Sequence, residues 1–199
     1  RRRGVRLHLG ARSYLEKQNT THKIFLGATG YFNLFNYATL SSSFAFSQSS
    51  RSSNFTSANV RVRGHSSGSF FSLFGGESAQ SLTQLTVRGY PNVSLISRVA
   101  SYAGLEYQMT LANLFRGFGT FPLFFKQLNL FAFGETIYFP ISGLSKAWMP
   151  ATGGGLRLKS DILLNIPLQV SVEYHYGIEK AYLGNSELLF SLGLPTVSF

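Results

Sequence analysis

Residues 87–107 read VRGYPNVSLISRVASYAGLEY, and they hold the pattern that decides the fold. From Arg98 the side chains alternate in character: every second position from Val99 to Leu111 is uncharged. The positions between them carry Arg98 and Glu106. A repeat of two residues is typical of a β-strand whose two faces meet different surroundings.

The region before this strand, residues 73–97, is polar and has no regular pattern, so we predict a long luminal or extracellular loop there. It carries the triplet Arg88, Gly89 and Tyr90. A loop between two glycine-bearing strands can fold back against the inner wall of a sheet, where Arg88 would meet an acid. Glu106 is the nearest such acid in the sequence.

The same period of two continues along almost the whole chain, and helical periodicity is nearly absent. We predict about eight strands in one domain spanning residues 1–199. Their approximate ranges are 5–16, 24–35, 57–72, 98–112, 124–138, 155–162, 168–177 and 186–199. The Ser-rich residues 37–56 fit either a long connection or a weak hairpin around Phe44 to Phe46. The chain is therefore expected to be all-β and antiparallel.

The composition narrows the function classes. The 199 residues include no cysteine, which excludes disulfides and thiolate metal sites. The net charge of +10 would suggest nucleic acid, but the basic residues are scattered apart from Arg1 to Arg3, so we predict no nucleic-acid partner. No apolar run approaches the roughly 18–20 residues of a membrane-spanning helix. From Gly4 onward the residues alternate and do not form the apolar run of a signal peptide, so we expect none here; because the sequence also starts without a Met, we expect a piece of a longer protein.

No enzyme chemistry is indicated. His8 and His175 share faces with acids, but their spacing gives no metal-ligand set. The run Gly153 to Gly155 lacks the strand–helix context of a phosphate-binding loop, and no Ser/His/Asp arrangement stands out. We predict no catalytic residue, no cofactor and no metal.

The apolar faces of the strands raise the question of which solvent they meet. Charge is confined to the opposite faces, with Lys126 as an exception. A soluble sandwich or lipocalin-like barrel would turn the apolar face inward, but its strands average about 5–6 residues. The predicted strands are longer, and aromatic residues gather toward both rims, as in interfacial belts. These residues are Tyr138, Phe139, Trp148, Tyr174 and Tyr176 at one rim and Phe121, Phe124, Phe125 and Phe199 at the other. We therefore predict a transmembrane β-barrel in the lipid bilayer.

Four features together resemble the C-terminal part of the bacterial surface-antigen barrel. They are Phe70 to Glu77, Val87-Arg88-Gly89-Tyr90, Gly104-Leu105-Glu106-Tyr107, and five strands running to a terminal Phe199. This superfamily contains the outer-membrane assembly factors and the two-partner-secretion transporters. The resemblance covers residues 68–199.

The resemblance implies particular roles. Arg88 would be the loop arginine that pairs with inner-wall acids, and Glu106 the acid on the following strand. The next strand of the family shows Phe-x-Asp-x-Gly; here Phe131 fits, Phe133 stands at the Asp position and Glu135 at the Gly position. Glu135 would supply the displaced charge. Phe199 would be the terminal aromatic residue that the outer-membrane assembly machinery reads.

The resemblance also implies a bacterial outer-membrane location and a role in protein translocation or membrane-protein insertion, with a secreted or inserted polypeptide as substrate. Two alternatives stay open. The chain could form an anchoring or export barrel for an upstream soluble domain, or a small self-closed barrel with a structural or adhesion role. Because the family's barrel has twice as many strands, we favour the C-terminal half of a larger barrel.

Overall fold

The computed structural model describes residues 4–16, 19–50, 60–64, 84–91, 93–118, 121–140, 148–162 and 166–193. Eight strands form one antiparallel sheet in the order β1-β2-β3-β7-β8-β9-β10-β11. They are β1 (Gly4–Glu16), β2 (Asn19–Phe35), β3 (Ala38–Ser49), β7 (Val99–Phe118), β8 (Phe121–Tyr138), β9 (Trp148–Ile162), β10 (Ile166–Gly177) and β11 (Ser186–Gly193). The predicted all-β antiparallel class is confirmed.

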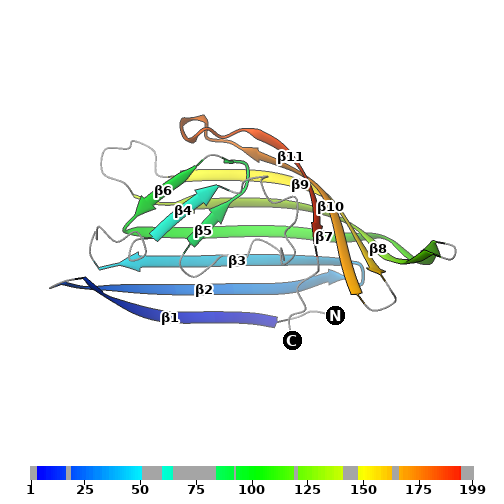
Figure 1. Cartoon of the computed structure of the whole chain (residues 1–199), viewed down its shortest axis with the longest axis horizontal. Coiled ribbons are helices and arrows are strands. Elements are labelled where there is room, and N and C mark those ends of the chain that lie inside the picture. Colours follow the sequence, from blue (N-terminus) through cyan, green and yellow to red (C-terminus); the bar gives the residue numbers. More distant parts are fainter. Residues whose placement is uncertain are drawn as a thin grey trace.

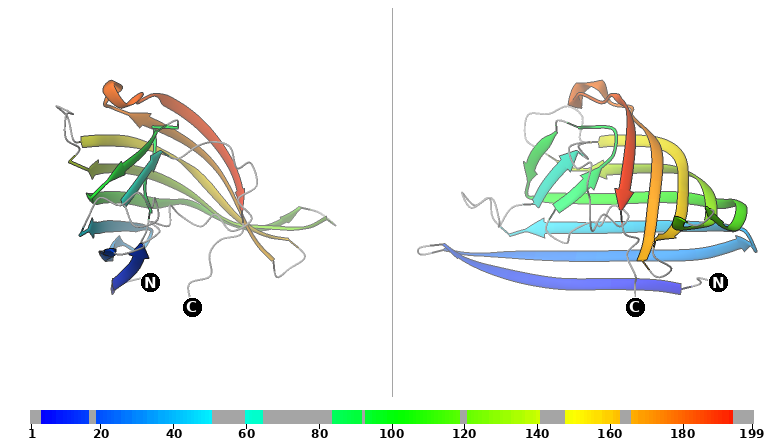
Figure 2. Two further views of the ribbon diagram at one scale, coloured as in Figure 1. Left: turned by 60° about the vertical axis from the view of Figure 1, so that its left-hand side comes forward. Right: turned by 45° about the vertical axis from the view of Figure 1, so that its right-hand side comes forward.

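The large sheet is strongly curved, and it does not close on itself (Figures 1 and 2). Strands β1 and β11 stand at its two edges, and no pairing joins them among the described residues. The one described helix is a short 3₁₀ turn, η1 (Lys180–Tyr182). No helix in the described part of the chain is long and apolar enough to cross a membrane.

A second, smaller sheet lies across one face of the large sheet (Figure 1). It consists of β4 (Val60–Gly64), which pairs in parallel with β5 (Gln84–Val87) and antiparallel with β6 (Ser94–Ser97). Buried apolar residues of this sheet, such as Val62 and Val87, pack against residues of β7, β8 and β9, such as Tyr102 and Ile137. The core of the molecule thus lies between the two sheets.

This arrangement corrects two predictions. The third strand of the large sheet is β3, from the Ser-rich region, and not residues 57–72. Residues 60–64 belong to the small sheet instead, and residues 65–72 lie outside the described residues. The inner face of β3 carries Ser47 and Ser49, each about 1% exposed. Because serine hides the apolar–polar contrast on which period-two patterns depend, the sequence did not reveal this strand.

The predicted loop 73–97 is also more ordered than expected where it is described, because it contains β5 and β6. Each of these strands has only four residues. That is too short for an alternating pattern to stand out from the sequence. Residues 73–83 lie outside the described part.

The outer face of the large sheet, which faces away from the small sheet, is apolar and exposed. Leu7 and Leu9 are 71% and 78% exposed on β1. Phe139, predicted to lie in an exterior belt, is instead fully buried in the core, where its ring centroid lies 5.3 Å from that of Tyr182. Lys126 leaves the apolar face because the β8–β9 register shifts between Phe125 and Gln127. This bulge lets its ammonium group form an ion pair with Asp161.

Candidate functional site

The candidate site lies where the tip of the loop after β5 reaches the inner face of β8. Gly89 adopts a φ of 76°, a left-handed conformation that glycine accepts without a steric penalty. This turn directs the preceding residue, Arg88, toward the strands. The Arg88 side chain is about 9% exposed, so its charge is almost fully removed from water.

Glu135 on β8 is the closest partner of Arg88. Its carboxylate accepts hydrogen bonds from the Arg88 backbone N–H (2.7 Å), Nε (3.1 Å) and Nη2 (2.8 Å). The Tyr102 hydroxyl donates a fourth hydrogen bond at 3.1 Å. Burial alone would lower the pKa of Arg88, but Glu135 and then Glu106 outweigh it, and the pKa is raised. The guanidinium therefore stays charged and fixed in orientation.

Glu106 on β7 joins Arg88 to a second arginine, Arg157 on β9. One Glu106 oxygen lies 3.4 Å from Arg88 Nη1, and the other accepts from Arg157 Nη1 at 2.7 Å. Arg157 Nε also lies 3.5 Å from Glu173 on β10, a distance within ion-pair range although the alignment makes no hydrogen bond. We call these five residues, Arg88, Glu106, Glu135, Arg157 and Glu173, the arginine cluster.

Two phenylalanine rings of β8 form the floor under both arginines. The Arg88 guanidinium carbon lies 3.3 Å from the centroid of the Phe133 ring, and that of Arg157 lies 3.6 Å from the centroid of Phe131. Such cation–π contacts strengthen when they are desolvated. A Cβ at Gly153 on β9 would lie only 2.7 Å from the Phe133 ring, so the absence of a side chain at Gly153 makes room for this floor.

The acidic end of the cluster continues onto β10. Glu173 accepts a hydrogen bond from the Ser171 hydroxyl at 2.9 Å and lies 3.0 Å from His175 Nε2. His175 is 1% exposed, and its ring packs edge-on against Phe133 with the two ring centroids 5.3 Å apart. Each acid of the cluster thus has a charged partner. The arrangement suits a fixed structural contact rather than a reactive group.

The structure brings most of the predicted site residues together. Arg88 and Glu106 form an ion pair, but Glu135, the second predicted inner-wall acid, is the closer partner. Sequence reasoning missed Arg157. Phe133, two residues before Glu135 on β8, is the ring beneath Arg88. Phe199 lies outside the described residues.

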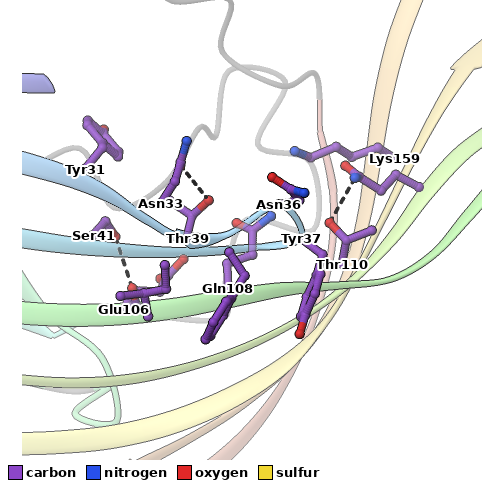
Figure 3. Close-up of a pocket in the computed structure, with 13 residues that line it drawn as sticks. Tyr31, Asn33, Asn36, Tyr37, Thr39, Ser41, Glu106, Gln108, Thr110 and Lys159 are labelled. Carbon is purple, nitrogen blue, oxygen red and sulfur yellow. Dashed lines mark hydrogen bonds between the residues drawn. The ribbon is translucent and has the colours of Figure 1, made fainter. Parts of the chain in front are cut away.

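No group of three or more potential metal ligands occurs within the described ranges. A polar cavity of about 430 Å³ adjoins the cluster on the same inner wall (Figure 3). Glu106 lies at one end of it, and the side chains of Asn33, Gln108 and Lys159 line it. Its walls bear amides and hydroxyls, as expected of a surface that meets water.

The chain was compared with known proteins in three ways. No protein-family model, no curated protein and no solved structure matches it.

Proposed function

We propose that this chain forms part of the wall of a bacterial outer-membrane β-barrel that takes part in polypeptide translocation or membrane-protein insertion. One observation carries the proposal. A loop tip bearing Arg88-Gly89-Tyr90 is held on the inner wall by Glu135 and Glu106, buried and hydrogen-bonded. This is the arrangement that the sequence resemblance predicts for the surface-antigen barrel.

The distribution of apolar and charged residues supports a lipid environment. On β1, the exposed Leu7 and Leu9 alternate with Arg6 and His8. The acids Glu106, Glu135, Asp161 and Glu173 all lie on the opposite, inner side of the large sheet. An apolar face this exposed would be costly in water, and a charge on it would cost about 2–4 kcal/mol at mid-bilayer. Lipid contact accounts for both features.

In this proposal the two edge strands, β1 and β11, pair with further strands, so that the chain supplies part of a larger barrel. An unpaired edge leaves backbone donors and acceptors without partners, which hydrocarbon does not tolerate. The cavity beside the arginine cluster then lies within the lumen.

A pair of tryptophan variants tests membrane insertion. Trp148 is the sole tryptophan, so Trp148→Phe gives a silent background. Phe44 (43% exposed) lies on the outer face of β3, and the adjacent Ser43 on the inner face. In vesicles of lipids brominated in mid-chain, we expect strong quenching for Phe44→Trp and little for Ser43→Trp. Equal quenching at both positions would contradict the proposed orientation.

The transport role needs a separate assay. Vesicles containing the full chain should accelerate the insertion of an unfolded, unrelated outer-membrane barrel protein, followed by its gel mobility shift. Arg88→Glu, which places an acid against Glu135, should abolish the acceleration. Equal insertion rates with and without the chain would overturn the proposed activity while leaving the membrane result intact.

A further inference from the structure

The loop tip has a second attachment, separate from the arginine cluster, at the turn between β10 and β11. The Gly89 carbonyl accepts a hydrogen bond from the Asn185 backbone N–H at 3.1 Å. The Tyr90 hydroxyl donates to the Pro150 carbonyl at 2.6 Å and accepts from the Glu179 backbone N–H at 3.0 Å. Tyr90 itself is fully buried. The same three-residue tip thus contacts β8 through Arg88. Its next two residues contact the β10–β11 turn and Pro150 of β9.

Two glycines make this second attachment possible. A Cβ on Gly177 would overlap the Gly89 carbonyl oxygen, and a Cβ on Gly89 would overlap the Gly177 backbone. The two backbones therefore approach more closely than any side chain would permit. By contrast, a Cβ on Gly134 of β8 would meet nothing within 4 Å.

The turn that receives the tip also organises the last strand. The Gly177 N–H donates to the Asn185 carbonyl at 3.0 Å, which closes the turn before β11 begins. Its helix η1 is capped by the Glu179 side chain, which accepts from the Ala181 N–H at 3.1 Å. Within the described chain, β11 pairs with a single strand, β10. The turn therefore fixes the start of this edge strand.

We infer that the loop tip holds the β10–β11 turn in place. When the tip leaves the arginine cluster, edge strand β11 therefore loosens at the same time. Arg88, Gly89 and Tyr90 are consecutive, and the tip cannot withdraw from Glu135 without also breaking its bonds to Asn185 and Glu179. The inference concerns contacts within the chain and does not depend on the proposed transport role.

Amide hydrogen exchange of the full chain, followed by mass spectrometry, tests this coupling. The readouts are the peptides covering β11 (residues 186–193) and the loop tip (residues 84–91). Arg88→Lys keeps the charge but loses the two-pronged bond to Glu135, and it changes the contact with the arginine cluster and not a contact with the turn. Gly177→Ala acts at the turn itself. We expect both variants to speed exchange in both peptides by about tenfold or more.

Gly134→Ala is the matched control, since it adds the same methyl group where there is space, and both peptides should keep their wild-type rates. Gel mobility confirms that each variant is folded. If Gly177→Ala does not fold, the exchange rates of Arg88→Lys alone test the coupling. Faster exchange of the loop tip in Arg88→Lys with β11 unchanged would overturn the inference. So would faster exchange of β11 in Gly177→Ala with an unchanged loop tip.

Discussion

Replacing Glu135 with glutamine tests the arginine cluster most directly, because this substitution removes the charge and keeps the shape. The Glu135 side chain is about 1% exposed and accepts three hydrogen bonds from Arg88. Removing one partner of a buried ion pair costs about 3–5 kcal/mol, since the other charge is left uncompensated. Glu106 remains 3.4 Å from Arg88 and retains part of the attraction. We therefore expect the free energy of unfolding to fall by about 3 kcal/mol, the lower end of that range. This is more than a hundredfold change in the unfolding equilibrium constant.

Urea unfolding in lipid vesicles, followed by the fluorescence of the single tryptophan, Trp148, measures this loss. Glu187→Gln is the control, because the described structure gives its carboxylate no ion pair and leaves one of its oxygens without a hydrogen-bond partner. It should change the free energy of unfolding by less than about 1 kcal/mol.

A double-mutant cycle completes the test. Combining Arg88→Met with Glu135→Gln removes both charges, so the double variant should lose clearly less than the sum of the single variants. We expect a coupling energy of about 1.5–3 kcal/mol, the range for charged hydrogen bonds. If Glu135→Gln costs no more than Glu187→Gln, or if the two losses simply add, then Arg88 is not held by Glu135.

Three further predictions use the same unfolding assay. Phe131→Leu removes the ring beneath Arg157 and should cost about 1–2 kcal/mol from lost cation–π contact and packing; no loss would show that the ring does not support the guanidinium. Gly153→Ala places a methyl group against the neighbouring strand and should lower the free energy of unfolding by about 2 kcal/mol or more. Gly134→Ala should change it by less than about 0.5 kcal/mol, and equal effects of the two substitutions would contradict the packing. Burial raises the pKa of Tyr90, so the folded state favours the neutral phenol. The stability from this group should be complete below pH of about 10 and fall as the pH rises further, and Tyr90→Phe should weaken that alkaline loss; an unchanged profile would exclude Tyr90 as its source.

The sequence predicted the strands whose two faces differ in polarity. Long alternating stretches such as Val99 to Leu111 and Leu168 to Tyr176 appear in the structure as β7 and β10. The alternation is a local property of the chain, so it can be read without knowing any neighbour. Where one face carries serine, as in β3, the contrast disappears and the strand was missed. The four-residue strands β5 and β6 offered too few repeats.

The cluster could be predicted only in part for a different reason. Arg88 and Glu106 stand out because a lone loop arginine precedes a strand with one acid. The choice of Glu135 as closer partner depends on the register of β7 and β8, which sets Glu135 opposite Gly104, where the absence of a side chain leaves space for the Tyr102 ring that binds Glu135. Arg157 enters from a third strand. No local pattern contains that information.

The sequence by itself determined an all-β chain whose charges share one face and whose apolar residues share the other. Only the tertiary structure decided that the core lies on the charged face, beneath the small sheet, and that Arg88 is shared between Glu135 and Glu106. The physical reason is that the two-residue repeat fixes the side on which each residue lies. The partner that each residue meets there is fixed by strand order, register and the path of a loop, which join residues far apart in the sequence, such as Gly89 and Asn185.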